Sequence, residues 1–170
     1  MTGSSPVDRS KLGTKRHILT DKKGIPIAVA ISSASTHDIK SVTDVIDNSI
    51  IKRTFVSSKP KEGMKQRRWK HNHLCLDRAY QSKLIEQEII NRGYVPHISY
   101  KRKRGQKKEE NTKQKRYSLS KNKRWVVERT NSWHNRFRKL FTRYEKKVEN
   151  YLGLVQLSSS IIIYRKLILG

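Results

Sequence analysis

The pattern of apolar and polar positions predicts a β-hairpin near the start of the chain. Residues 15–20 (KRHILT) and 25–32 (IPIAVAIS) are the two predicted strands, and the four-residue link 21–24 ends in Gly, which suits a tight turn. The second strand is apolar at nearly every position. We therefore expect it to lie inside a sheet and to be covered on both faces.

Three later segments show helical spacing of their apolar residues. Residues 39–50 (IKSVTDVIDNSI) predict a helix with Asp38 at its N-cap. Residues 121–143 predict one long helix that Ser120 caps and that no Pro or Gly interrupts, and residues 151–169 predict a mostly buried terminal helix. The apolar stripe of the long helix consists of Val126, Thr130, Trp133, Phe137, Leu140 and Tyr144.

Between these helices the pattern predicts a β-α-β unit. Residues 73–77 (HLCLD) form a short buried strand, residues 79–93 a helix that Gly93 closes, and residues 94–99 (YVPHIS) a further strand. A right-handed crossover would place the two strands parallel. The chain is therefore expected to be of the α/β class.

The charge of the chain indicates that the protein binds a partner. Its 170 residues suit one domain, residues 1–170, and carry a formal net charge of +25. Residues 52–72 and 100–118 are predicted basic loops. Such an excess of positive charge repels itself, so we expect a polyanionic partner, and nucleic acid is the first candidate. A membrane is not expected as a partner, because the basic residues do not gather into one amphipathic anchor.

Cysteine content and the N-terminal segment favour a soluble protein of a reducing cytoplasm. The single cysteine, Cys75, excludes an internal disulfide and a cysteine-rich zinc site, and we expect it to be buried as a small apolar residue. The start of the chain has no apolar segment of the signal-peptide kind, and no apolar run reaches membrane-spanning length.

Two carboxylates are candidates for chemistry. Asp77 closes a predicted strand, where ligands of α/β folds collect, and Glu128 lies on the long helix among Arg and Lys residues. Hard oxygen ligands favour Mg²⁺ or Mn²⁺, the ions that serve phosphodiester cleavage. Such sites use three or more carboxylates, so this pair is one short. The alternative for Glu128 is a charge-balancing residue on a solvated basic helix face.

Three segments resemble the DDE transposases of bacterial insertion sequences, specifically the IS-four/IS-five superfamily, whose catalytic domain is RNase H-like. They are residues 8–38 (DRSKLGTKRHILTDKKGIPIAVAISSASTHD), residues 73–80 (HLCLDRAY) and residues 124–145 (RWVVERTNSWHNRFRKLFTRYE). The resemblance covers almost the whole chain from Asp8 onward. It implies an RNase H-like mixed sheet flanked by helices and truncated at the N-terminal strand.

The resemblance assigns roles to individual residues. Asp77 matches the second catalytic acid, Glu128 the third, and Arg124 an arginine that contacts DNA phosphate. The family's tyrosine before that arginine falls on Lys121 and is not kept. The stripe of the long helix is then expected to pack largely on the terminal helix, which leaves Glu128 over the sheet edge.

The first catalytic Asp of the family has no match in this chain. It lies on a strand upstream of the GTKRH segment, and Asp8, Asp21 and Asp38 match other positions. We therefore expect the chain to be the C-terminal part of a transposase, either a degenerate fragment or the second reading frame of an element that uses frameshifting. Loss of one ligand in three is expected to cripple metal-dependent cleavage.

The leading hypothesis is a catalytic domain that, when complete, binds transposon-end DNA and cleaves and joins phosphodiester bonds with Mg²⁺ or Mn²⁺. Its expected partners are double-stranded DNA, a second copy of the chain and an upstream-frame polypeptide, and its DNA-bound form would associate with the nucleoid. His37 and Asp38 are expected to support the site. The residues expected to contact DNA are Arg124, Arg129, Arg136, Arg138, Lys139, Lys15 and Arg16.

Two other functions fit the charge. The first is a catalytically inactive DNA-binding protein that occupies element ends and inhibits transposition, and the absent acid favours it. The second is an RNA-binding protein, which gives no reason for the pairing of the Asp77 and Glu128 motifs. Trp125 and Trp133 are expected in the core or in a groove wall rather than as base-stacking platforms. A zinc site at His71 and His73 is not expected, because no third ligand lies near them in sequence.

Overall fold

The computed structural model describes residues 2–5, 10–50, 72–98 and 123–170, except for the side chain of Arg124. The chain forms two compact units, one made of residues 1–50 and 123–170 and the other of residues 51–122. The predicted basic loops lie outside the described residues, apart from Asn72. That residues 1–170 form a single domain stays a prediction.

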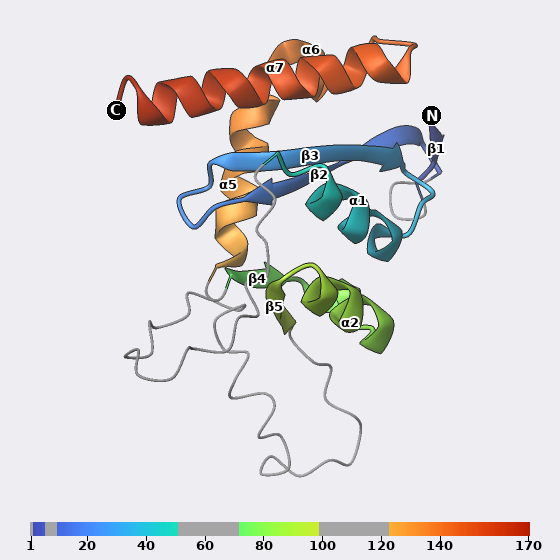
Figure 1. Cartoon of the computed structure of the whole chain (residues 1–170). Coiled ribbons are helices and arrows are strands. Elements are labelled where there is room, and N and C mark those ends of the chain that lie inside the picture. The colour runs from blue at the N-terminus through green and yellow to red at the C-terminus, as the bar shows by residue number, and fades with distance from the viewer. Residues whose placement is uncertain (1, 6–9, 51–71, 99–122) are drawn as a thin grey trace, which may run out of the picture. The chain divides into compact units, whose positions relative to one another are not determined.

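The first unit contains an antiparallel sheet with the strand order β1-β2-β3 (Figure 1). Its strands are β1 (Gly3–Ser4), β2 (Leu12–Thr20) and β3 (Pro26–Ser33). The predicted hairpin is confirmed, because β2 and β3 pair antiparallel around the turn. The expectation that β3 lies inside the sheet is wrong for the described strands, because β3 ends their order.

Both faces of β3 are nevertheless covered, as its continuous apolar sequence predicts. Val29 packs in a core cluster with residues of the helices α6 (Arg138–Phe141) and α7 (Val148–Leu167). Its neighbours Ala28 and Ala30 point to the opposite face and pack with Val45. Val45 belongs to α1 (Val42–Asp47), which Figure 1 shows on the side of the sheet away from α7.

The predicted helix 39–50 is shorter than expected, and its N-cap is different. The chain forms the 3₁₀-helix η1 (Asp38–Ser41) and then α1, and Ile50 is 93% exposed. The cap is His37, whose Nδ1 accepts a hydrogen bond from the backbone N–H of Ile39 over 3.4 Å. Asp38 does not cap because its carboxylate instead binds the ammonium group of Lys15 at 2.8 Å.

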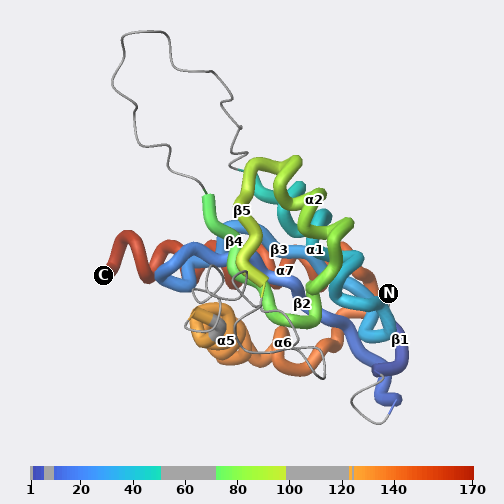
Figure 2. Tube along the Cα trace, turned by 90° about the horizontal axis from the view of Figure 1, so that it is seen from below, coloured from blue at the N-terminus to red at the C-terminus, as the bar shows by residue number. Residues whose placement is uncertain are grey.

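The predicted long helix 121–143 is two helices. The first, α5 (Arg124–Asn135), ends before Phe137, which has extended backbone with φ −85° and ψ 104° and precedes α6. Phe137 packs against the cluster that contains Val29, so tertiary packing ends the helix without a Pro or Gly. Figure 2, which looks along α5, shows α6 beside it. Ser120 lies outside the described residues, and the residue at the N-cap, Lys123, makes no side-chain capping bond.

The predicted terminal helix is confirmed as α7, but it is not mostly buried. Tyr151 and Val155 of this helix are 3% and 0% exposed and pack in the core cluster that contains Val29. On its outer side Leu157, Tyr164 and Ile168 are 58%, 54% and 68% exposed. The helix therefore buries only one of its apolar faces within the described residues.

The second unit is the predicted parallel β-α-β unit. The strand β4 (Asn72–Leu76) leads through the 3₁₀-helix η2 (Arg78–Tyr80) and the helix α2 (Lys83–Asn91) to β5 (Tyr94–Ile98), which pairs parallel with β4. Gly93 follows α2 with φ +84°, the left-handed conformation that glycine adopts at a helix end.

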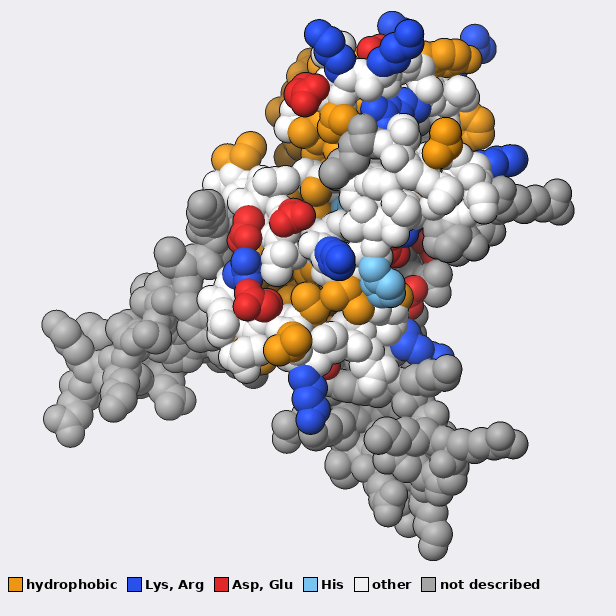
Figure 3. Space-filling model, turned by 90° about the vertical axis from the view of Figure 1, so that its right-hand side faces the viewer, with side chains coloured by type: hydrophobic (Ala, Val, Ile, Leu, Met, Phe, Trp, Pro, Cys, Tyr) orange, Lys and Arg blue, Asp and Glu red, His pale blue; other side chains and the backbone are white. Residues whose placement is uncertain are grey.

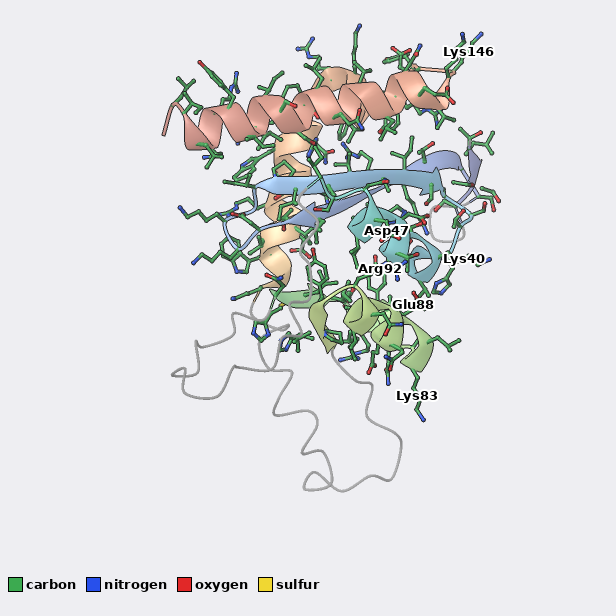
Figure 4. All side chains as sticks on the ribbon, in the orientation of Figure 1. Lys40, Asp47, Lys83, Glu88, Arg92 and Lys146 are labelled. Atoms are coloured by element: carbon green, nitrogen blue, oxygen red, sulfur yellow. The ribbon has the colours of Figure 1, made fainter. Side chains whose placement is uncertain are left out.

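An ion pair lies at the C-terminal end of α2. Arg92 Nη1 lies 2.5 Å from Glu88 Oε2, one turn earlier in the helix (Figure 4).

The strand β4 has one buried residue. Leu74 is buried, and Cys75 is exposed. The expectation of a buried cysteine is therefore wrong, because alternate residues of a strand face opposite sides and Cys75 is on the side away from Leu74.

The described residues thus form a mixed α/β structure with helices and two sheets. One sheet is antiparallel and the other is parallel. Among these residues, no helix combines the length and the apolar character that crossing a membrane requires.

Candidate functional site

Asp77 lies where the sequence places it, directly after a parallel strand. Its backbone is extended, with φ −71° and ψ 163°, and it caps η2. One carboxylate oxygen, Oδ1, accepts a hydrogen bond from the backbone N–H of Arg78 at 2.7 Å. The residue is exposed. Its carboxylate is therefore oriented at the carboxyl end of β4 by a local bond, on a residue that is exposed to solvent.

Glu128 is exposed on α5, on the side opposite to the buried stripe of that helix. The stripe is formed by Val126, Thr130 and His134, which are 6%, 0% and 0% exposed. At about 100° per residue these three residues lie on one side of the helix, and Glu128 lies on the other. Glu128 is therefore separated from the packing residues of α5, as a metal-binding role would require.

The stripe packs on two elements rather than mainly on the terminal helix. Thr130 Oγ1 donates a hydrogen bond to the carbonyl oxygen of Gly24, in the turn between β2 and β3, over 2.6 Å. Farther along the helix, His134 contacts Ser158 of α7. Trp133 is only partly buried, and Tyr144, at the end of the predicted stripe, is 78% exposed.

The turn between β2 and β3 is fitted closely to α5. Gly24 is buried and has φ +82°, and a Cβ atom there would lie 3.0 Å from Thr130 Oγ1. Beside it, Arg129 Nη2 donates to the carbonyl oxygen of Lys23 over 2.5 Å. Two consecutive carbonyl groups of the turn thus accept bonds from two consecutive side chains of α5, which fixes the helix that carries Glu128.

His134 is a buried residue that the sequence analysis missed. Ser158 Oγ donates to the carbonyl oxygen of Val155, so His134 Nδ1 is the donor in the 2.8 Å bond to that hydroxyl. Burial, and then the positive charge of Arg16, lower the pKa of His134 to about 4. The available signal was its position four residues after Thr130, which continues the helical stripe through His134 instead of Trp133.

The basic residues predicted to contact DNA fall into two groups. Lys15 binds the Asp38 carboxylate and the carbonyl oxygen of Thr36, and Arg16 Nη2 donates to Asn135 Oδ1 over 2.5 Å. Together with Arg129, these residues are engaged within the first unit. The side chain of Arg124 lies outside the described part.

The second group is exposed. Arg136, Arg138 and Lys139, at the junction of α5 and α6, are exposed and have no side-chain partner among the described residues. Figure 3 shows several Lys and Arg side chains at the top of the view, the level at which Figure 1 places α6 and α7. Arg136, Arg138 and Lys139 are therefore part of the exposed positive surface of the first unit.

No group of three His, Cys, Asp or Glu residues that could hold a metal ion occurs in the described ranges. Asp77 belongs to the second unit and Glu128 to the first. Each offers the hard carboxylate oxygens that Mg²⁺ or Mn²⁺ prefers, but the described residues do not supply a complete ligand set. That the two carboxylates share one metal site stays a prediction.

Two acids near the start of the chain are committed to other bonds. Asp21 Oδ1 accepts hydrogen bonds from the backbone N–H groups of Lys23 and Ile25, both at 2.8 Å, and so shapes the hairpin turn. Asp38 forms the ion pair with Lys15. His37, expected to support the site, is exposed and caps η1.

A histidine pair in the second unit was not expected from the sequence. His73 Nδ1 lies 2.6 Å from His97 Nε2, across the β4 and β5 pair. His73 is exposed and His97 is 6% exposed. The described residues supply no group of three metal ligands here, and two imidazoles by themselves do not make a zinc site.

Comparison with known proteins supports the resemblance. The family described as "Transposase DDE domain" matches residues 2–162. A curated relative from Burkholderia cepacia, named "Putative transposase for insertion sequence element IS402", is 28% identical over 167 residues, which cover 98% of this chain and 70% of the relative. No solved structure matches the chain significantly. With the Asp77 and Glu128 motifs in the matched region, the chain belongs to the DDE-domain family of insertion-sequence transposases.

Proposed function

We propose that the chain provides the catalytic domain for metal-dependent DNA cleavage and strand transfer in the transposition of an insertion sequence. The observation that carries this proposal is the placement of two accessible carboxylates in the family's motifs. Asp77 stands exposed at the carboxyl end of β4, and Glu128 stands exposed on the side of α5 away from its packing stripe. The divalent ion, when bound, would activate water and stabilise the leaving oxygen of a phosphodiester.

In this proposal the two acids hold Mg²⁺ or Mn²⁺, and the fold keeps them in position. The bond from the backbone N–H of Arg78 orients the Asp77 carboxylate. The bonds from Thr130 and Arg129 to the hairpin turn fix the helix that carries Glu128. Such support determines whether ligands stay within the narrow geometry that catalysis needs.

The DNA partner follows from charge. A net charge of +25 favours a polyanion. The exposed residues Arg136, Arg138 and Lys139 are free to neutralise phosphates, and we assign them the principal contacts with double-stranded element ends. We assign Lys15, Arg16 and Arg129 a supporting role, because their side chains already bind groups of the protein.

A third carboxylate must come from another source in this proposal. Asp21 and Asp38 are committed to the turn and to Lys15, which argues against either of them as a metal ligand. An upstream-frame polypeptide is the source we propose, with an RNase H-like sheet as the complete arrangement. β1 pairs with β2 at Leu12 and Gly13, and beyond Gly13 this edge of β2 pairs with no other described strand, so it offers a place for a further strand.

The described residues contain no group of three acids that could hold a metal ion, and this favours a second function for the chain by itself. In that function the chain would bind element ends, compete with an active transposase and so inhibit transposition. In either role we place the protein in the bacterial cytoplasm, where it would associate with the nucleoid when bound to DNA.

The test is cleavage of a labelled element-end duplex with Mg²⁺ or Mn²⁺. We compare the chain alone with the chain supplied with its upstream-frame polypeptide, and we expect only the second preparation to cut. Asp77→Asn and Glu128→Gln should each abolish cutting. The matched controls Asp44→Asn and Glu149→Gln, which change exposed acids of α1 and α7, should retain it.

Other outcomes decide between the alternatives. If the chain binds the duplex but neither preparation cuts, and it blocks a complete transposase, the inhibitory function holds. If the chain cuts by itself and Asp38→Asn silences it, our assignment of the third ligand is wrong. If Glu128→Gln cuts as well as the unchanged protein, the catalytic proposal is wrong.

A further inference from the structure

The outer side of α7 carries an apolar stripe with the spacing of a coiled-coil seam. Its members recur at alternating steps of three and four residues, and they are Leu154, Leu157, Ile161, Tyr164 and Ile168. Ile168 directly follows α7 and keeps helical backbone. This alternation is the a and d pattern of a heptad, in which each apolar side chain fits between residues of a facing helix. We call these five residues the α7 seam.

The seam lies on the side of α7 opposite to its buried face. Val155 is 0% exposed and packs with Val29 of the sheet, which α7 crosses on one face (Figure 1). At about 100° per residue, Tyr164 lies half a turn away from Val155. Leu157, Tyr164 and Ile168 are 58%, 54% and 68% exposed. A row of exposed large apolar side chains is the mark of an interaction surface.

The seam is free of charge in a chain that is otherwise strongly basic. Charged residues make up 31% of the sequence, yet residues 150–164 contain none. The nearest charges along the chain are Glu149 before this stretch and Arg165 after it. This side of α7 therefore has no cations with which to attract a nucleic acid.

The charge of the whole chain points to a second copy as the partner of the seam. Two copies with a net charge of +25 each repel one another, and an uncharged apolar strip is the part of the surface on which they repel least. A heptad seam requires a facing helix with the same pattern, and α7 of another copy supplies it. The surface is thus complementary to itself, as a twofold interface must be.

We propose that the α7 seam pairs with the α7 seam of a second copy of the chain, with the two helices antiparallel. A pair centred on Ile161 places Leu157 of each copy against Tyr164 of the other. A parallel pair would bring the two Arg165 side chains together, whereas the antiparallel pair separates them by about 12 Å along the helix axis. The pairing needs neither DNA nor a metal ion, so its test is independent of the proposed function.

The first test is sedimentation velocity of the full chain, freed of nucleic acid, over a range of protein concentrations. The seam is about 21 Å long, which is short for a permanent interface, so we expect a dimer that dissociates on dilution. High salt screens the repulsion between two basic copies and should tighten the dimer. Copies bridged by a polyanion would instead separate as salt is added. A monomer at every concentration, or a dimer that high salt dissociates, overturns the proposal.

Substitutions at the seam supply the second test. Leu157→Lys should raise the dissociation constant of the dimer by about a hundredfold, because the twofold axis brings two unpaired charges into an apolar contact. Leu84→Lys is the matched control, since Leu84 of α2 is a 79% exposed leucine outside the seam, and it should leave the dimer unchanged. The proposal is overturned if Leu157→Lys dimerises like the unchanged chain. It is also overturned if Leu84→Lys loses the dimer to the same extent.

A mixture of two variants tests the antiparallel arrangement. Tyr164→Glu, like Leu157→Lys, should weaken the dimer when it is measured by itself. An equal mixture of the two variants should dimerise better than either one, because the two new charges face each other in the mixed pair and its second contact is unchanged. Recovery in the mixture also shows that both variants fold. A mixture as weak as the separate variants overturns the antiparallel pairing.

Discussion

Thr130 Oγ1 donates a hydrogen bond to the carbonyl oxygen of Gly24 over 2.6 Å, and this bond joins α5 to the β2–β3 turn. The two residues are 106 positions apart in the chain. The same Oγ1 lies 3.1 Å from the carbonyl oxygen of Val126, so the single hydroxyl proton is shared between the turn and the helix. Because Glu128 lies on the same helix, this contact determines where that acid is held within the first unit.

We expect Thr130→Val to lower the free energy of unfolding by about 1 to 3 kcal/mol, because the substitution leaves the Gly24 carbonyl group without its buried donor. Thr130→Ser keeps the hydroxyl and should lose less. Ser132→Ala, at an exposed position of α5, is the control and should be nearly neutral. Urea unfolding monitored by circular dichroism measures the effect. A stable Thr130→Val variant would mean that the bond to the turn contributes little.

Two glycines should respond in opposite directions to the same substitution. Gly24→Ala places a Cβ atom in a left-handed backbone, 3.0 Å from Thr130 Oγ1, and should destabilise the protein by about 1 to 2 kcal/mol. Gly153→Ala adds a methyl group on α7 that meets no atom within 4 Å, and should stabilise the helix by about 0.5 to 1 kcal/mol. Thermal unfolding of the two variants tests the pair. Equal effects would contradict the close fit of the turn.

The buried His134 should make stability depend on pH. Its pKa is lowered to about 4 in the folded protein from 6.5, so the unfolded chain binds more protons between these values. The stabilisation is present in full above pH 6.5 and is lost as the pH falls toward 4, by up to about 3 kcal/mol.

His134→Gln removes the titrating group and should flatten the fall in unfolding free energy between pH 6.5 and 4. Urea unfolding at several pH values gives both curves, and the difference in their slopes isolates His134 from other groups. The variant need not equal the unchanged protein in stability at pH 7. Parallel curves would show that His134 keeps its ordinary pKa.

The exposed basic residues should contribute separately to the salt dependence of DNA binding. Lys139→Gln removes a phosphate contact in our proposal, and should reduce the slope of log K against log salt by about 0.9. Lys40→Gln makes the same charge change at an exposed residue of η1, away from α6, and should leave the slope unchanged. Fluorescence anisotropy with a duplex at several salt concentrations measures both. Equal slopes for the two variants would remove Lys139 from the contacting set.

Local patterns predicted the elements better than their ends and their exposure. The hairpin, the parallel β-α-β unit and the terminal helix are confirmed, because each depends on residue periodicity and on turn residues close in sequence. The end of α5 at Asn135 was not predictable in this way, because Phe137 leaves the helix to pack in a distant core cluster. The N-cap at His37 was missed for a similar reason. Asp38 does not cap the helix because Lys15 of β2 binds its carboxylate.

Composition and periodicity were enough to predict a basic α/β protein, because they need no knowledge of long-range contacts. The resemblance of three segments to DDE transposases then singled out Asp77 and Glu128 as the acids to consider. Which charged side chains are exposed and which bind groups of the protein became known from the folded structure alone. It paired Lys15 with Asp38, fixed Arg129 between two tryptophans and buried His134, because such contacts join residues that the chain separates widely and that only folding brings together.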